Sequence, residues 1–180
     1  MELYIVRHGT TVWNEQKRTQ GRVNNRLSAK GKQESQELAK ALKNKSIDYI
    51  FCSPLMRAVQ TANIINQYHK QKIVKDKRLT DIDQGVFSGR YFLQLSTEEL
   101  EAKRSRSKAY GMESLREMYL RVKDFFEYLL KNFSTKTVLV VTHSGVASFL
   151  QKMTLNSEYS LESFGKTDLF GNAQIKHFVL

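Results

Sequence analysis

The amino-acid sequence predicts an α/β fold built around a largely parallel β-sheet. Strand-like and helix-like patterns alternate along the 180 residues, an order that is typical of strands joined by helical crossovers. Residues 137–141, TVLVV, form a continuous run dominated by β-branched side chains, which indicates a strand buried on both faces. The chain has one proline and no visible Gly/Ser-rich linker or internal repeat, so we expect a single domain over residues 1–180.

The first predicted strand leads into a long loop and then a helix. Leu3–Arg7 is mostly apolar and is predicted to be a strand. Residues 9–27 are polar and are predicted to be a loop, and a loop of this length inside a compact domain is usually functional. Ser28 has the side chain of a helix N-cap, and the helix after it is expected to run to about Lys43.

Residues 47–53, IDYIFCS, predict the next strand, and a helix is expected to follow it directly. Ser53 is a candidate N-cap for that helix. Pro54 would then occupy the first helical position, where its missing N–H group breaks no hydrogen bond. The helix is expected to end near Tyr68, and a short strand is expected near Ile73.

Residues 90–112 are predicted to form a small insertion in the fold. Ser96 and Glu99 have the spacing of a capping box and predict a short helix within it. Ser114 and Glu117 repeat this spacing and predict the start of a longer helix. The apolar side chains of that longer helix keep helical spacing: Leu115, Met118, Tyr119, Val122, Phe125 and Leu129. After the strand at residues 137–141, a further helix and a last strand at residues 173–180 complete the predicted order.

The composition limits the class of protein. The formal net charge is +11, and a basic protein concentrates anions such as nucleic acids, membrane surfaces or phosphorylated metabolites. No apolar stretch approaches the ~20 residues of a membrane helix, and the start MELYIVRHG lacks the pattern of a secretory signal. Cys52 is the only cysteine, so an intrachain disulfide is excluded and a cytoplasmic location is expected. One Cys and four scattered His show no zinc-binding spacing, so no metal is expected.

Two predicted strands end in the same way. LYIVRHG ends in His8 followed by glycine, and VLVVTHSG ends in His143 followed by serine and glycine. Because the carboxyl ends of parallel strands form the ligand crevice of an open sheet, we expect these two histidines to meet there. Two independent strand ends with one pattern favour a functional role for both. His69 and His177 lack this context and are interpreted as structural or surface histidines.

Arg57 is predicted to contribute a third element to this crevice. It lies in the first turn of a helix that also begins at a strand end. The N-terminus of a helix attracts anions through its free N–H groups and its dipole. An arginine in that turn adds a planar set of donors that suits phosphate oxygens.

An ordered set of motifs covers nearly the whole chain: RHG at 7–9, WN at 13–14, QG at 20–21, SPLMRAVQTA at 53–62, DIDQGVFSG at 81–89, GMES at 111–114, VTHSG at 141–145 and NAQI at 172–175. This set resembles the histidine phosphatase superfamily, in its phosphoglycerate mutase-like branch. The resemblance implies a three-layer α/β/α sandwich with a mostly parallel central sheet, in which residues 90–112 are a small lid.

The resemblance also implies a mechanism that suits these residue types. His8 would be the nucleophile and would form a phosphohistidine, since a neutral imidazole is nucleophilic near neutral pH. Arg7 and Arg57 would lower the pKa of that imidazole and stabilise the transferring phosphoryl group, to which His143 would donate a further hydrogen bond. The family implies no metal and no cofactor. Arg7 and Arg57 would also bind the substrate, together with five further matching positions: Thr11, Asn14, Gln20, Gly21 and Ser144.

Asp81 departs from the family pattern, which usually has a glutamate as the proton donor at this point. The aspartate keeps a carboxyl group but is one methylene shorter, a loss of roughly 1.5 Å of reach. Three interpretations remain open. Asp81 donates the proton, or Asp83 substitutes for it, or neither acts efficiently and the protein is slow or mainly binds phosphate.

The short lid favours a phosphomonoester hydrolase acting on a small phosphorylated metabolite. A phosphoglycerate mutase is an alternative, but mutases of this branch have a larger insertion that excludes water. A protein-phosphohistidine phosphatase is a second alternative, because such relatives tend to have almost no lid. The non-enzyme alternative is a phosphate- or polyanion-binding protein with weak activity. No nucleic-acid recognition motif is visible, so neither nucleic acid nor membrane is an expected partner, and the oligomeric state stays open.

Basic residues near the predicted lid have two possible roles. Residues 103–108, KRSRSK, are either a clamp for a second acidic group of the substrate or a solvated surface segment. Arg18, Arg22 and Arg26 on the first loop are candidates to face the mouth of the pocket.

Overall fold

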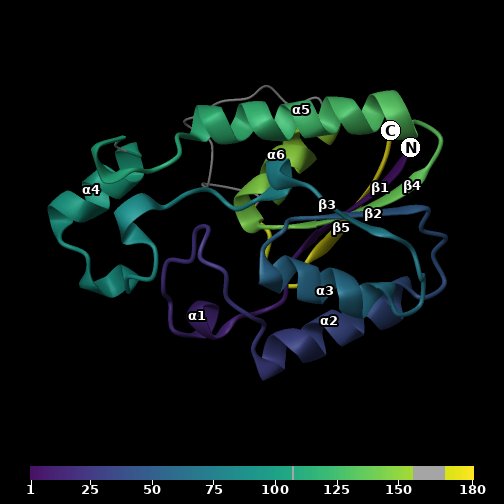
Figure 1. Cartoon of the computed structure of the whole chain (residues 1–180), viewed down its shortest axis with the longest axis horizontal. Coiled ribbons are helices and arrows are strands. Elements are labelled where there is room, and N and C mark those ends of the chain that lie inside the picture. Colours follow the sequence, from purple (N-terminus) through teal and green to yellow (C-terminus); the bar gives the residue numbers. More distant parts are fainter. Residues whose placement is uncertain (107, 156–168) are drawn as a thin grey trace.

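The computed structural model describes residues 1–106, 108–155 and 169–180. These residues form strands and helices in the following order (Figure 1): β1 (Glu2–Arg7), α1 (Val12–Glu15), α2 (Ala29–Leu42), β2 (Tyr49–Cys52), α3 (Met56–Asn66), β3 (Ile73–Lys75), α4 (Thr97–Ser105), α5 (Leu115–Phe133), β4 (Thr137–Thr142), α6 (Ser144–Thr154) and β5 (Ile175–Val179). Short 3-10 turns lie between these elements: Lys77–Leu79, Gly85–Phe87, Phe92–Gln94 and Lys108–Tyr110. Strands and helices therefore alternate as the sequence predicts.

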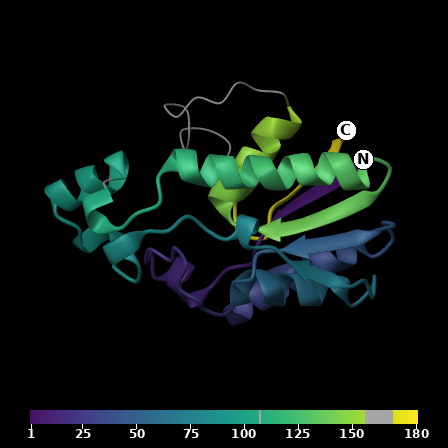
Figure 2. The same cartoon turned by 45° about the horizontal axis from the view of Figure 1, so that its top comes forward.

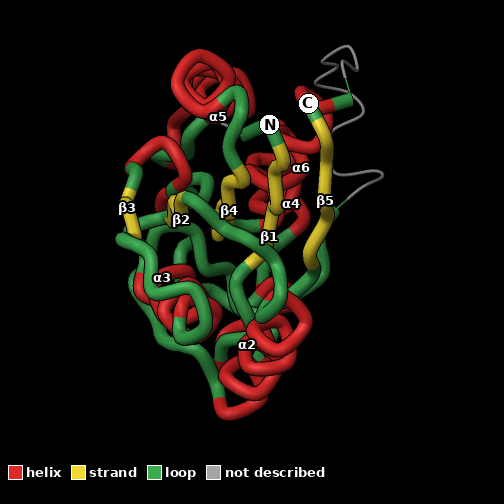
Figure 3. Tube along the Cα trace, turned by 90° about the vertical axis from the view of Figure 1, so that its right-hand side faces the viewer, coloured by secondary structure: helices red, strands yellow, loops and turns green. Residues whose placement is uncertain are grey.

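The strands of the described residues form one five-stranded sheet in the order β3-β2-β4-β1-β5 (Figure 3). The pairs β1–β4, β2–β4 and β2–β3 are parallel, and β5 pairs antiparallel with β1 at the edge. The TVLVV run forms the central strand β4, and its residues Val138–Val141 are fully buried. The prediction of a mostly parallel sheet is confirmed.

Helices cover both faces of the sheet, as Figures 1 and 2 show. On one face α5 and α6 pack on side chains such as Leu3, Ile5 and Val140. On the other face α2 and α3 pack on the alternate side chains, such as Val6 and Val141. Because successive strand residues point to opposite faces, one sheet separates two apolar cores. The predicted three-layer α/β/α sandwich is confirmed.

The register of the sheet brings three strand ends to one edge. Arg7 of β1 lies opposite Thr142 of β4, and Cys52 of β2 lies opposite Val141. Backbone hydrogen bonds continue one residue beyond β1 and β2. The amide of His8 donates to the Thr142 carbonyl, and the amide of Ser53 donates to the Val141 carbonyl, both at 3.0 Å. The residues that directly follow β1, β2 and β4 are therefore neighbours.

Serine caps begin three of the helices as predicted. Ser28 accepts a hydrogen bond from the amide of Gly31, and the predicted capping boxes at Ser96 and Ser114 are both complete. Each hydroxyl satisfies an amide that the first helical turn leaves without a partner. α2 ends at Leu42, close to the predicted end at Lys43.

The predicted start of α3 is wrong. The helix begins at Met56 with Leu55 as its N-cap, so Ser53 does not cap it and Pro54 is not its first residue. Asn24 from the first loop takes over the capping, because its Oδ1 accepts a hydrogen bond from the Met56 amide at 2.7 Å. The hydroxyl of Ser53 contacts His143 instead. α3 also ends at Asn66, before the predicted Tyr68.

Residues 90–112, the predicted lid, extend away from the sheet at the N-terminal end of α5 (Figures 1 and 2). Its own core is small, formed by the buried side chains of Phe87, Leu95 and Met112. Backbone hydrogen bonds join it to the first loop, where Thr19 pairs with Gly89 and Arg90. That loop contains one helical turn, α1, which Thr11 caps. The lid is therefore anchored mainly to the first loop and to the start of α5.

Candidate active site

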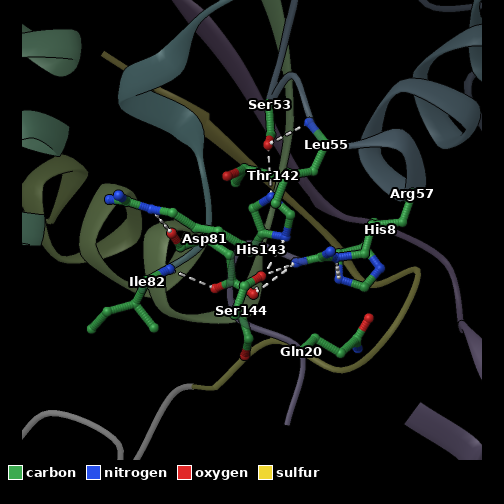
Figure 4. A network of polar contacts seen from close by, with 12 residues as sticks. His8, Gln20, Ser53, Leu55, Arg57, Asp81, Ile82, Thr142, His143 and Ser144 are labelled. Carbon is green, nitrogen blue, oxygen red and sulfur yellow. Dashed lines mark hydrogen bonds and ion pairs between the residues drawn. The ribbon is translucent and has the colours of Figure 1, made fainter. Parts of the chain in front are cut away.

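The side chains that follow β1, β2 and β4 converge at the carboxyl edge of the sheet (Figure 4), where the sequence predicts the ligand crevice. His8 follows β1, Ser53 follows β2 and His143 follows β4. The ring centroids of the two histidines are 5.2 Å apart, and both side chains are buried. The sequence prediction that these two histidines meet is confirmed.

His8 presents an unprotonated ring nitrogen to this crevice. Its Nδ1 lies 2.7 Å from the carbonyl oxygen of Gly9, which can only accept, so Nδ1 carries the proton and Nε2 carries the lone pair. The Nε–H group of Arg57 donates to Nε2 at 3.2 Å. Burial, and then the charges of Arg57 and Arg7, hold the pKa of His8 well below its usual value. The ring is therefore neutral at physiological pH.

Arg57 is completely buried, and acceptors surround its guanidinium group. One terminal nitrogen donates to the Val23 carbonyl at 2.8 Å. The other donates to the Gly21 carbonyl at 2.8 Å and to Asp81 Oδ2 at 2.9 Å. The first loop thus holds one side of the group, and the side facing the crevice contacts His8 and Asp81 (Figure 4).

Asp81 reaches the crevice although it is shorter than a glutamate. Its Oδ2 lies 2.9 Å from Arg57 and 3.7 Å from Nδ1 of His143. Asp83 points elsewhere, because its Oδ1 accepts from the Gly85 amide and its Oδ2 pairs with Arg22. The geometry brings Asp81, and not Asp83, to Arg57 and His143.

A carboxylate and two arginines hold the backbone of the Asp81 segment. Glu113 accepts two hydrogen bonds from Arg121, at 2.7 and 3.0 Å, and pairs with Arg22 at 3.2 Å. Both arginines also donate to the carbonyl oxygen of Asp81, at 3.3 and 3.4 Å. The amide of Asp83 donates to Glu113 at 3.2 Å. This network fixes the direction in which the Asp81 side chain leaves the chain.

Two buried nitrogens at the crevice lack a hydrogen-bond partner. Within residues 1–106, 108–155 and 169–180, neither Nε of Arg7 nor Nδ1 of His143 has one. Buried polar atoms of this kind are rare and call for an explanation. α6 begins at Ser144 and its N-cap, His143, gives no side-chain cap, so amides of its first turn also face an anion favourably. The arrangement can bind a group with several anionic oxygens.

The residues of the first loop surround Gln20 and Asn14. Oδ1 of Asn14 accepts from the amide and hydroxyl of Thr11, both at 3.0 Å, and from Asn172 at 3.3 Å. The Thr11 hydroxyl, which has one hydrogen to donate, lies 2.9 Å from Oε1 of Gln20 as well. Since the Thr11 amide and Asn172 already occupy Oδ1 of Asn14, the amino group of Asn14 is the part suited to an anion. Thr11 itself is buried and shapes the loop.

The side chains of the basic tract, residues 103–108, differ in their contacts. Lys103 donates to Thr19 and Gln84, and burial lowers its pKa to about 8. Arg106 donates to the backbone carbonyls of Asp83 and Glu113. Both side chains therefore tie the lid to its base. Arg104 is exposed, Lys108 pairs with Glu117, and Ser107 lies outside the described residues.

The three arginines of the first loop have different environments. Arg18 stacks on Trp13 and Tyr91 and donates to the Gly89 carbonyl. Arg22 belongs to the network around Glu113, and Arg26 is exposed. Within the described residues these contacts hold Arg18 and Arg22 to the lid and to the Asp81 segment.

Three contributors to this site were not identified from the sequence. The pattern assigns Ser53 to a helix cap, although its place directly after a strand parallel to β4 is the signal that reveals it. Glu113 belongs to the GMES motif, but its partner Arg121 lies two turns along α5 and has no local signal. Asn172 comes from the NAQI motif and donates to the His8 carbonyl at 3.3 Å.

The described residues have neither a metal-binding cluster nor a membrane-spanning helix. In the ranges 1–106, 108–155 and 169–180, no group of three or more His, Cys, Asp or Glu side chains is placed to hold a metal ion. None of the helices described for this chain combines the length and the apolar character needed to cross a membrane.

The chain is similar to curated enzymes over most of its length. Phosphoserine phosphatase 1 of Hydrogenobacter thermophilus is 33% identical over 150 residues, which cover 80% of this chain and 71% of that protein. An Enterobacter sp. protein named "Probable phosphoglycerate mutase GpmB" is 33% identical over 153 residues, or 82% of this chain and 71% of its own length.

A solved structure shares the fold. It is a phosphoserine phosphatase mutant from Entamoeba histolytica in complex with phosphoserine, with a TM-score of 0.81 and 25% sequence identity. The match covers 99% of this chain and 90% of that chain. Residues 3–180 match the family described as the histidine phosphatase superfamily (branch 1). The resemblance seen in the sequence is thus confirmed, and the chain belongs to the histidine phosphatase superfamily, branch 1.

Proposed function

We propose that this protein hydrolyses small phosphomonoesters through a covalent phosphohistidine on His8. The observation that carries the proposal is the position of the unprotonated Nε2 of His8. It accepts a hydrogen bond from Arg57, and two buried nitrogens beside it, Arg7 Nε and His143 Nδ1, have no hydrogen-bond partner in the described residues. Preorganised donors around a nucleophile are the arrangement that phosphoryl transfer requires.

In the first step the lone pair on His8 Nε2 forms a bond to phosphorus. The P–O bond to the leaving group breaks at the same time, and the Asp81 carboxyl group gives a proton to the leaving oxygen. Arg57, Arg7 and His143 would stabilise the three other phosphoryl oxygens. The low pKa of His8 supports this role, because the ring does not have to lose a proton before it attacks.

In the second step a water molecule attacks phosphorus and gives a proton to the Asp81 carboxylate. The N–P bond breaks, its electron pair returns to His8 Nε2, and inorganic phosphate leaves. Asp81 is thereby restored to its protonated form for the next ester. One residue therefore acts as acid and then as base.

The geometry supports Asp81 over Asp83 as the proton donor. Oδ2 of Asp81 lies 2.9 Å from Arg57 and 3.7 Å from Nδ1 of His143. A phosphoryl group bound by these two residues would therefore lie beside the Asp81 carboxyl group. Asp83 is instead held by the Gly85 amide and by Arg22.

Phosphoglycerate mutase activity is the second candidate, because one relative carries that name. The two activities differ only in what accepts the phosphoryl group from His8. The small core of the lid, three buried apolar side chains, supports transfer to water, since a mutase must keep water out. Hydrolysis of a protein phosphohistidine would use the same site without a proton donor.

A substrate panel tests the proposal. Purified protein is incubated with phosphoserine, 3-phosphoglycerate, sugar phosphates, a nucleotide and a phosphohistidine peptide, and phosphate release is measured for the wild type, His8→Ala and His177→Gln. His177 lies on β5 and stacks on Tyr4 of the neighbouring strand β1, outside the candidate site. It is therefore the matched histidine control. We expect release from at least one small ester, loss in His8→Ala and retention in His177→Gln. Activity that survives in His8→Ala, or release from no compound, would contradict the proposal.

A further inference from the structure

The hydroxyl of Ser53 lies where it can decide which nitrogen of His143 carries the proton. Ser53 Oγ is 2.7 Å from Nε2 of His143, and both side chains are buried. A neutral histidine has one donor nitrogen and one acceptor nitrogen, and the partner of one fixes the role of the other. The direction of this single hydrogen bond therefore sets the character of the nitrogen that faces the crevice.

The second contact of Ser53 determines that direction. The amide of Leu55 donates to Ser53 Oγ at 3.3 Å, so one lone pair of the hydroxyl oxygen is used. Among the described residues, the other hydrogen-bond partner of Ser53 Oγ is Nε2 of His143, so the hydroxyl hydrogen has Nε2 as its acceptor. The opposite arrangement, with the proton on Nε2, would leave that buried hydrogen without an acceptor.

The surroundings of Nδ1 agree with this assignment. Nδ1 lies 3.7 Å from Oδ2 of Asp81 and faces the crevice (Figure 4). A lone pair on Nδ1 would point at a carboxylate and repel it, whereas an N–H group is attracted to it. Burial, with the charge of Arg57, keeps the pKa of His143 well below its usual value, so the ring is neutral and has only one proton.

We propose that Ser53 is a positioning residue that holds His143 in the tautomer with its proton on Nδ1, so that this N–H group is aimed at the phosphoryl group. The inference rests on the proposed function for its kinetic consequence, but the tautomer itself does not depend on it. His8 and His143 then have the same tautomer but present different nitrogens to the crevice. The unprotonated Nε2 of His8 faces it as a nucleophile, and the protonated Nδ1 of His143 faces it as a hydrogen-bond donor.

The assignment explains the sequence between β2 and α3. A serine directly after β2 reaches the residue directly after β4, because the two strands are parallel and in register. Pro54 and Leu55 then turn the chain, and Leu55 supplies the amide that orients the hydroxyl. The hydroxyl of Ser53 thus contacts His143 and does not cap α3, whose N-cap is Leu55.

The test measures the tautomer directly. Protein labelled with nitrogen-15 in its histidines is studied by long-range proton–nitrogen correlation at neutral pH, and His143→Gln assigns the His143 signals. We expect a protonated Nδ1 and an unprotonated Nε2 in the wild type, and a shift of the proton toward Nε2 in Ser53→Ala. Ser53→Thr keeps the hydroxyl and should restore the wild-type pattern. A wild-type spectrum with the proton on Nε2 would overturn the inference even if no variant folds.

Kinetics add a second readout. We expect kcat of Ser53→Ala to fall about 10-fold or more while KM changes little, within the roughly 10²- to 10³-fold that complete loss of such a donor costs. Ser148→Ala removes another buried hydroxyl, on α6, and should retain activity. An unchanged His143 tautomer in Ser53→Ala, or equal losses in Ser53→Ala and Ser148→Ala, would refute a positioning role. Activity in His8→Ala would instead refute the proposed function and leave the tautomer result standing.

Discussion

The edge of the sheet and the lid are built in different ways. At the sheet edge, parallel strands in register present His8, Ser53 and His143 in a buried crevice. In the lid, a core of three side chains is held mainly by polar contacts, and Phe92 and Leu93 remain exposed. The difference teaches that the groups proposed to act on phosphorus belong to the buried, hydrogen-bonded edge of the sheet. The groups on the leaving-group side depend on a segment that ion pairs hold in place.

Asp81 lies at the boundary between these two regions. Its carboxylate contacts Arg57 at the sheet edge, while its backbone is held by the network of Glu113, Arg22 and Arg121 at the base of the lid. Variants on either side of this boundary should therefore have different kinetic signatures.

The largest effect is expected for Arg57→Gln at the sheet edge. The variant loses the positive charge beside the phosphoryl group, and kcat should fall by roughly 10³- to 10⁵-fold, the range known for an arginine that stabilises phosphoryl transfer. Arg104→Gln, an exposed arginine of the lid helix α4, is the matched control and should change kcat little. Equal losses in steady-state assays would remove the distinction between the two regions.

A smaller and more selective effect is expected for Asp81→Asn. Loss of a general acid should slow alkyl phosphates by roughly 10²- to 10⁴-fold. It should slow p-nitrophenyl phosphate much less, because that leaving group needs no proton. Asp83→Asn is the matched control, since Asp83 faces Arg22 and Gly85. Full activity of Asp81→Asn on alkyl esters would contradict the role of Asp81 as the proton donor. Loss of activity in Asp83→Asn alone would assign that role to Asp83.

Glu113→Gln should also slow alkyl phosphates selectively, but by a smaller factor than Asp81→Asn. The variant weakens the pairs with Arg121 and Arg22 and loosens the backbone of Asp81, and a misplacement of that kind can cost up to about 100-fold. We expect kcat to fall for alkyl esters and to stay close to wild type for p-nitrophenyl phosphate. A uniform loss on both substrates would mean that Glu113 supports the fold rather than the proton donor.

The smallest effect is expected in the pH dependence of stability. The pKa values of His8 and His143 are lowered in the folded protein, so below pH ~6.5 the unfolded chain binds more protons than the native one. The free energy of unfolding should therefore fall as the pH drops from 7.5 to 5.5, by at most about 1.4 kcal/mol per pH unit for each histidine.

Urea titrations at several pH values measure this slope. His143→Asn should reduce this slope, because it removes one of the two histidines whose pKa is lowered. A slope that is unchanged in His143→Asn would show that this histidine is not kept neutral by the fold.

Local chemistry made much of the fold predictable from the sequence. The capping boxes at Ser96 and Ser114 fixed the starts of α4 and α5, and the β-branched run fixed the central strand. His8, Arg57 and His143 were predictable because each lies at a strand end or a helix start. Their meeting followed from the rule that parallel strands share a carboxyl edge.

Contacts between distant residues explain what the sequence did not reveal. Ser53 has the local signal of a cap, but its hydroxyl contacts a residue 90 positions away. The reach of Asp81 depends on Glu113 and on two arginines from different elements. Lys103 and Arg106 resemble a substrate clamp in sequence, yet they contact neutral oxygens within the protein.

Trapping the phosphorylated enzyme tests the central claim most directly. The wild type, His8→Ala and His177→Gln are mixed rapidly with the best ester of the panel, quenched in alkali, and analysed by intact mass and peptide mapping. The account predicts an acid-labile adduct with the mass of one phosphoryl group on the peptide containing His8, present in His177→Gln and absent from His8→Ala. Turnover without any adduct on His8, or an adduct on another residue, would contradict it.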